Sequence, residues 1–400
     1  MKYTSAQLRK HKSGWRGLLR YKGPDGAWHT RSKVLESTGK REARQELAEW
    51  RAEMEDAAAW EVPGSKRPGD VAEFVAQYID TLDMSGAVEP SSVSGYRQIW
   101  KHILGAFPGT SFDALDSESA QAWVNGLVAD GYAPSTVRKT LNLLKAAYKD
   151  AVARRLIPYS PIDAVRAPKL PRREPNSLDK SQRARLLAFL DVAGDSPVNL
   201  AVRIALGTGM REAEVCGLRW RDVDLNAASL TVRNVIARGE SGTYEKEPKT
   251  SSSRRDIPLP DELVSALRRR RANLAEECMD AGVMMTPAHY VIGKVDGTYE
   301  DPHHLWSQWR AIAKSLNLVG TEGRIPTFHD LRHTFATAAI AAGADVKSVA
   351  SIMGHSNVAM TLNVYASADA EAKRQAMSKA AAAISEAPRP AEILRIADAG

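Results

Sequence analysis

Two short motifs near the carboxyl end of the chain carry residue types that suit phosphate chemistry. The first spans residues 329–334 (HDLRHT), the second spans 354–357 (GHSN), and Tyr365 follows the second. His329 and Arg332 are three residues apart, so a helix would place both on one face, aimed at one ligand. A phosphate is the natural ligand for such a pair. The pattern predicts a site that cuts a phosphodiester.

A second group of candidate residues lies upstream. In residues 208–220 (TGMREAEVCGLRW), Arg211 directly follows a glycine turn, at the start of an expected helix whose first turns also carry Glu214. Farther on, Lys249 stands in residues 247–250 (EPKT), ahead of 253–259 (SRRDIPL). This arrangement predicts that Arg211 projects into a cleft and that Lys249 lies at a hairpin tip.

These motifs together resemble the tyrosine recombinase family, the phage integrases and their relatives. The resemblance covers most of residues 177–370, and Met210 and Met353 stand where leucine is commoner in the family. It implies DNA cleavage and rejoining through a 3′-phosphotyrosine, which keeps the energy of the broken bond and requires no ATP, metal or other cofactor. The sequence likewise shows no P-loop or metal-spaced carboxylate cluster. The matching residues follow the family's order: Arg211 with Glu214, Lys249, His329, Arg332, His355 and Tyr365.

The needs of phosphoryl transfer suggest a role for each side chain. Arg211 and Arg332 are permanently charged forks that would clamp the non-bridging oxygens in the transition state. Tyr365, a phenol with an ordinary pKa of about 10, must lose its proton as it attacks. The family assigns the proton-acceptor role to His329 and a phosphate hydrogen bond to His355. The sequence itself leaves the order of the two histidines open.

The departing 5′-oxygen needs a proton, which a lysine with a pKa lowered by nearby arginines would supply. Lys249 lies on the family's Lys-Thr-x-x-Ser-Arg pattern and Lys246 does not, so we expect Lys249 to be the acid.

Three neighbours are expected to have supporting roles. Glu214 would orient Arg211. Asp330 would make a contact at the start of its helix. His333 is expected to be a buried structural histidine.

Composition limits the class of protein. The chain has 400 residues with 44% apolar side chains, which predicts two or three domains, each with a core. Cys216 and Cys278 are its only cysteines and have no paired spacing, so neither a disulfide framework nor a zinc site is indicated. No signal peptide or membrane-spanning run is apparent, which favours a cytoplasmic protein with no membrane contact.

The expected fold is multidomain and mainly α. Residues 1–64 predict a three-stranded β-sheet plus a helix, and residues 1–44 hold 12 Lys/Arg against 3 Asp/Glu. Such density favours a nucleic-acid partner, and the unit resembles the arm-type DNA-binding domain of larger integrases. We expect one sheet face to carry the DNA-binding residues Arg16, Arg20, Arg31 and Lys33.

The rest of the chain is expected to be mostly helical. Residues 65–168 predict a helical core-binding domain with helices at 71–83, 90–106, 117–130 and 134–156. A basic, proline-punctuated linker at 169–176 adds Lys169, Arg172 and Arg173 as DNA contacts. Residues 177–386 predict a mostly helical catalytic domain with a small β-sheet, and 387–400 form a tail.

The resemblance also implies partners. These are double-stranded DNA with core-type and arm-type sites, three further copies of the chain in a tetramer on DNA, and a host DNA-bending protein with an excision factor. Two other functions stay open: a type IB topoisomerase, which uses similar chemistry, and a non-catalytic DNA-binding regulator, which has no use for Tyr365.

Overall fold

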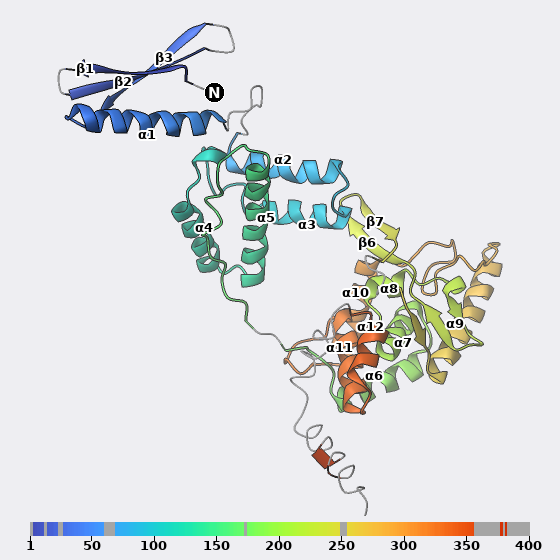
Figure 1. Cartoon of the computed structure of the whole chain (residues 1–400). Helices are drawn as coiled ribbons and strands as arrows, with labels where there is room; N and C mark the ends of the chain where they lie inside the picture. Colours follow the sequence, from blue (N-terminus) through green and yellow to red (C-terminus); the bar gives the residue numbers. More distant parts are fainter. Residues whose placement is uncertain are drawn as a thin grey trace, which may run out of the picture. The chain divides into compact units, whose positions relative to one another are not determined.

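The computed structural model describes residues 3–11, 14–22, 27–59, 69–171, 174–248 and 254–355, together with 377, 378 and 381. The chain divides between Pro171 and Arg172 into two compact units. Helices are the main elements, with small antiparallel sheets in both units (Figure 1). The predicted mainly α, multidomain fold class is confirmed.

The chain begins with a three-stranded antiparallel sheet. Strands β1 (Ser5–His11), β2 (Gly14–Lys22) and β3 (Trp28–Leu35) pair in that order, and helix α1 (Lys40–Ala59) lies along one face (Figure 1). Leu19 and Leu47 are buried between sheet and helix. Gly17 allows the close approach, because a Cβ there would lie 2.7 Å from a Leu47 methyl carbon. The predicted β-sheet-plus-helix unit is present.

The strand register corrects one prediction about this sheet. Arg16, Arg20, Arg31 and Lys33 do not share a face, because Arg31 pairs directly with buried Leu19. Directly paired residues point to the same side of a sheet, and residues two apart in a strand do so as well. Arg31 and Lys33 therefore lie on the side covered by α1, whereas Arg16 and Arg20 lie on the open side. Composition shows that the segment is basic, but only the strand register shows which face of the sheet each basic side chain occupies.

A second core belongs to a helical bundle. Its helices are α2 (Val71–Met84), α3 (Pro90–Trp100), α4 (Ser117–Ala129) and α5 (Pro134–Ala153), with a short 3-10 turn η1 (Phe112–Ala114). Helix α5 buries Leu141, Leu144 and Tyr148 along one stripe, as its period predicts. Helix α3 ends six residues before the predicted boundary at 106. The chain instead makes tighter turns, in which the Ile103 N–H bonds the Trp100 carbonyl and Ile103 is buried.

The second unit has the largest core. Helices α6 (Lys180–Ala193), α7 (Pro197–Thr208), α9 (Asp261–Asp280) and α10 (Pro302–Ser315) contribute much of it. Strands β4 (Val223–Asp224), β5 (Ser229–Thr231) and β8 (Asp256–Pro258) form one sheet, while β6 (Val235–Gly239) and β7 (Gly242–Lys246) form a hairpin. Helix α8 (Glu212–Cys216) leads to the 3-10 turn η2 (Trp220–Asp222), and α11 (Phe328–Ala341) precedes α12 (Val346–Met353).

Candidate active site

Arg211 is held at the start of α8 by a buried carboxylate. Helix α7 ends at Gly209, whose φ of +67° is left-handed, and Arg211 then forms the N-cap of α8. Its backbone N–H donates to Glu214 Oε2 at 2.9 Å, and its Nη1 donates to Glu214 Oε1 at 2.7 Å. Glu214 is only 2% exposed. The predicted helix start and the predicted contact between Glu214 and Arg211 are both present.

Arg332 reaches the same region from α11. It is 1% exposed, and its Nη1 donates to the Gly209 carbonyl at 2.6 Å. Its Nη2 is buried and has no hydrogen-bond partner among the residues that the structure describes. Burial, and then the neighbouring Arg211, lower the Arg332 pKa to about 9, against a raising effect of Glu214. Arg332 thus remains charged at neutral pH and keeps one donor for an anion.

Gly209 ties the two arginines together. Its carbonyl accepts from Arg332, and Arg211 follows it by two residues. A Cβ on Gly209 would lie 2.5 Å from the Phe335 ring, and the positive φ also disfavours any other residue. The glycine turn of the sequence motif therefore allows α11 to pack closely against the end of α7, two residues before Arg211.

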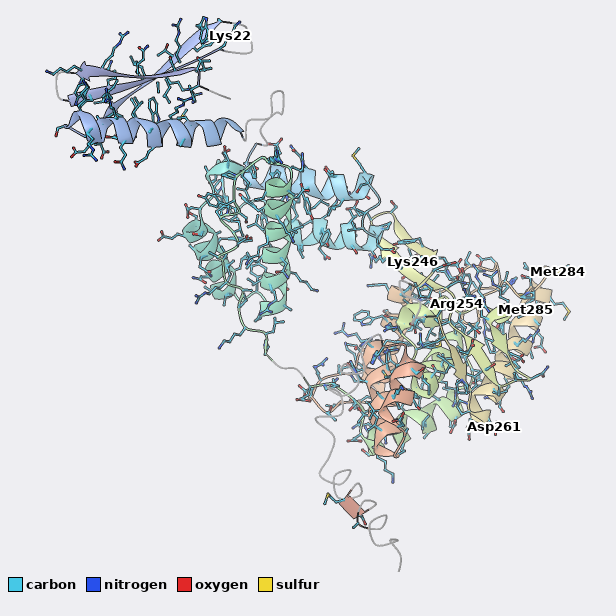
Figure 2. All side chains as sticks on the ribbon, viewed as in Figure 1. Lys22, Lys246, Arg254, Asp261, Met284 and Met285 are labelled. Atoms are coloured by element: carbon cyan, nitrogen blue, oxygen red, sulfur yellow. The ribbon has the colours of Figure 1, made fainter. Side chains whose placement is uncertain are left out.

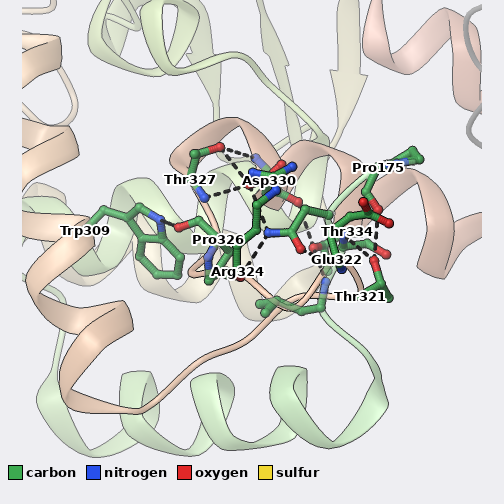
Figure 3. Close-up of polar contacts among 12 residues, drawn as sticks. Pro175, Trp309, Thr321, Glu322, Arg324, Pro326, Thr327, Asp330 and Thr334 are labelled. Atoms are coloured by element: carbon green, nitrogen blue, oxygen red, sulfur yellow. Dashed lines mark hydrogen bonds and ion pairs between the residues drawn. The ribbon is translucent and has the colours of Figure 1, made fainter. Parts of the chain in front are cut away.

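The first turn of α11 is anchored by Asp330, as Figure 3 shows. Asp330 accepts from the Thr327 N–H at 2.7 Å, while the Thr327 hydroxyl accepts from the Asp330 N–H at 3.3 Å, which completes a capping box. Asn176 Nδ2, which is buried, also donates to Asp330 at 3.4 Å. The predicted helix-start role of Asp330 is confirmed. The anchor fixes the turn from which His329 and Arg332 project.

Both candidate histidines are neutral at pH 7. Burial lowers the His329 pKa to about 4, with smaller contributions from His333 and Arg332. Burial also lowers the His355 pKa to about 4, followed by the charges of Arg332 and Arg211. His329 is nevertheless exposed, so it is surrounded by protein without being sealed from solvent. A neutral imidazole is able to accept a proton.

His333 is half-buried and lies edge-on to His329, with 4.9 Å between the ring centres. Its Nδ1 is buried. It packs against the candidate acceptor, in line with a structural role.

Arg255 is a member of this cluster that the sequence motifs do not indicate. It follows the family's lysine pattern by one residue, and its side chain is 7% exposed. Its Nη2 donates to Glu214 Oε2 at 2.9 Å, so Arg211 and Arg255 share one carboxylate. Its residue type alone does not distinguish Arg255 from an ordinary surface arginine.

The other candidates belong to the first unit or fall outside the described residues. Tyr365, Lys249, Arg172 and Arg173 are outside them. Lys169 is exposed on an irregular segment of the first unit. Lys246 ends β7, and Lys246 and Arg254, both labelled in Figure 2, lie on either side of residues 249–253 in the sequence.

The described residues show neither a metal-binding cluster nor a membrane-spanning helix. No group of three or more His, Cys, Asp or Glu side chains in that part of the chain is arranged to hold a metal ion. None of the described helices is both long enough and apolar enough to cross a membrane.

Residues 176–372 match the model of the phage integrase family. The transposase of transposon Tn916 from Enterococcus faecalis is 30% identical over 281 residues, which cover 66% of this chain and 67% of that protein. Among solved structures, the Tn1549 transposon integrase in complex with a circular intermediate DNA is 25% identical. Its TM-score is 0.64, and the match covers 78% of this chain and 99% of that one.

A lambda integrase tetramer bound to a Holliday junction has the same fold. Its TM-score is 0.53 at 17% identity, and the match covers 88% of this chain and 95% of that one.

The two neutral histidines make stability depend on pH in a defined window. Their pKa is about 4 in the folded protein and about 6.5 when unfolded, so the unfolded state binds more protons below about pH 6.5. The free energy of unfolding should therefore fall as the pH drops from about 6.5 towards 4, and His329→Gln with His355→Gln should reduce that fall. Urea unfolding at about pH 7.5 and about pH 5 measures it.

His102→Gln, in the other unit, controls for the loss of a histidine as such. A double variant that loses as much stability on acidification as the unsubstituted protein contradicts the assignment.

Proposed function

We propose that this chain, which belongs to the phage integrase family of tyrosine recombinases, is the site-specific integrase of a mobile element. As a member of that family it cleaves and rejoins DNA. Tyr365 is the proposed nucleophile. The observation that carries the proposal is the grouping of Arg211 and Arg332 with two neutral histidines, because it supplies positive charge and a proton acceptor together.

The proposed reaction is a transesterification in which atoms and charges balance. The Tyr365 oxygen attacks phosphorus and the bond from phosphorus to the 5′-oxygen breaks. The phenolic proton passes to neutral His329, and Lys249 protonates the departing 5′-oxygen. Rejoining reverses each step with a 5′-hydroxyl from the partner strand. One phosphodiester bond is thus exchanged for another, with no net hydrolysis.

Arg211 and Arg332 are proposed to stabilise the charge that develops on the non-bridging oxygens. The buried Nη2 of Arg332 supports this role, since a preorganised charged donor costs little reorganisation during the reaction. Loss of such a donor typically costs about 3 kcal/mol of transition-state stabilisation. His355 is assigned a hydrogen bond to the same phosphate.

The open face of the first sheet is proposed to grip arm-type DNA. Arg16 and Arg20 lie on this face, and the register adds Arg9, opposite Arg16, and Lys22, labelled in Figure 2. Exposed Trp28 pairs with Lys22, and the Arg20 guanidinium stacks 4.8 Å from the Trp28 ring centre. A basic strand face of this kind suits a DNA backbone or groove.

The remaining segments complete the proposed scheme. Residues 1–64 bind arm-type sites, 65–168 bind the core site, 169–176 form the linker, 177–386 perform the chemistry, and 387–400 form a tail. Lys169, Arg172 and Arg173 are proposed linker contacts to DNA. Four protomers would act on two duplexes in the cytoplasm. The number of protomers is suggested by the lambda integrase tetramer bound to a Holliday junction. A host DNA-bending protein and an excision factor would act with them.

Covalent attack by Tyr365 is the central test. A core duplex is first selected from a random library by its binding to the protein, and is then nicked to trap the intermediate. The protein should form a denaturant-stable adduct, and Tyr365→Phe should bind the duplex without forming it, because phenylalanine lacks the attacking oxygen. Gel electrophoresis of labelled DNA measures the adduct.

Tyr159→Phe alters an exposed tyrosine of the other unit and should retain the adduct. Binding without any adduct in the unsubstituted protein would support a non-catalytic regulator instead.

The acid role of Lys249 is tested through the leaving group. Lys249→Ala should slow cleavage of normal DNA by about 100-fold or more, since general-acid assistance contributes roughly that much. The rate should recover when a 5′-thiolate leaves, because a thiolate needs no proton. Single-turnover cleavage of both substrates measures this, with Lys246→Ala as the matched control. Equal slowing on both substrates assigns Lys249 another role.

The face assignment of the first sheet yields a paired test. Arm-type DNA is first identified as the flanking sequences that the full chain selects from a library and that a chain lacking residues 1–64 does not select. Arg16→Gln with Arg20→Gln should weaken binding to these sequences. Two lost phosphate contacts should reduce the slope of log affinity against log salt by about 2. Filter binding over a salt series measures both.

Arg31→Gln with Lys33→Gln removes the same charge from the other face. It should have the smaller effect, and adduct formation on the isolated core duplex should persist in both variants. Equal weakening by the two pairs contradicts the face assignment.

A further inference from the structure

Arg255 joins two parts of the catalytic cluster that are distant in sequence. Its Nη1 and Nη2 donate to the two oxygens of Glu214 at 3.2 and 2.9 Å. Its Nε donates to the carbonyl of Ile352, near the end of α12. One guanidinium therefore bonds both the carboxylate that holds Arg211 and the helix that precedes His355.

The Glu214 carboxylate depends on this contact. Burial raises its pKa, but the hydrogen bond and charge of Arg255, followed by those of Arg211, outweigh burial and hold the pKa below its ordinary value. Without Arg255 the buried carboxylate would lose the two hydrogen bonds that this guanidinium donates and would keep Arg211 as its cationic partner, which makes its burial more costly. Arg255 thus makes the largest contribution to stabilising the ionised Glu214 that orients Arg211.

Gly354 brings the backbone before His355 onto the same guanidinium. A Cβ at Gly354 would lie 2.9 Å from Arg255 Nη1 and 3.1 Å from its Cζ, and the residue has a φ of +67°. The Gly354 carbonyl accepts from Arg211 Nη2 at 3.4 Å. The chain therefore crosses both guanidinium groups immediately before it reaches His355.

We propose that Arg255 is a positioning residue of the active site, which fixes Glu214 and the end of α12 and thereby sets Arg211 and His355 relative to each other. Arg255 does not touch the phosphate in this role. It acts through its hydrogen bonds to both carboxylate oxygens of Glu214 and to the backbone carbonyl of Ile352. The inference rests on the proposed recombinase chemistry and adds a residue to it.

The kinetic test compares two buried arginines. Arg255→Met should slow single-turnover attack on the nicked core duplex by about 100-fold, because small displacements of positioned groups cost roughly that much. Its affinity for the duplex should fall far less than the rate. Arg270→Met is the matched control, since Arg270 is also buried and bonds a carboxylate, Glu277, and backbone carbonyls away from the site. Both variants are assayed well below their unfolding temperatures.

A double variant shows whether Arg255 acts through Glu214. Glu214→Gln combined with Arg255→Met should slow attack by less than the product of the two single effects, because both substitutions remove the bridge between Arg255 and Glu214. An Arg255→Met protein that attacks DNA as fast as Arg270→Met overturns the proposal. Fully additive losses in the double variant also overturn it.

A measurement without DNA separates this inference from the proposed function. His355 faces Arg332 and His333 from α11, Arg211 from α8, and Arg255 itself. Arg255→Met removes one positive charge and leaves Glu214 less compensated, so the His355 pKa should rise in an NMR titration, assigned with His355→Gln. It should not move in Arg270→Met. An unchanged His355 pKa in Arg255→Met refutes the positioning role, whereas failure of the unsubstituted protein to form an adduct refutes only the proposed function.

Discussion

A single buried carboxylate governs the arrangement of the candidate catalytic residues. Glu214 is 2% exposed and accepts from the Arg211 backbone, the Arg211 side chain and Arg255. An isolated ion pair would be neutral and would attract an anion only weakly. With Arg332 included, three guanidinium groups stand against one carboxylate, so the cluster is positive and still has a charged group to hold each arginine in place. Rigidity and attraction for phosphate come from the same contacts.

The same positive charge sets the protonation state of the histidines. Arg332 and Arg211 add to burial in lowering the His355 pKa, and His333 and Arg332 add to burial at His329. Both imidazoles are therefore neutral before DNA binds. In the proposed reaction a bound phosphodiester brings negative charge to the cluster, which favours the imidazolium and raises the basicity of His329, the proposed acceptor of the tyrosine proton. In this scheme the charge that attracts the DNA phosphate also keeps His329 unprotonated until the phosphate binds.

Patterns in the sequence predict the structure correctly where one period or motif determines the outcome. The stripe of α5, the N-cap position of Arg211 and the capping box of Asp330 all depend on residues within a few positions of one another. The predictions are wrong where a residue distant in the sequence determines the outcome. The faces of Arg31 and Lys33 depend on strand register, and the end of α3 depends on where Ile103 finds its core.

Arg255 illustrates the same limit within the active site. Its partners, Glu214 and Ile352, lie 41 and 97 residues away, so no local pattern marks it. A family motif identifies residues that meet the substrate, but it says little about those that hold them. Buried charge supplies a further criterion: a guanidinium only 7% exposed must be compensated, and here the compensating carboxylate is the one that also holds Arg211. In this protein that criterion leads from Glu214 to Arg255, and from Arg255 to the backbone before His355.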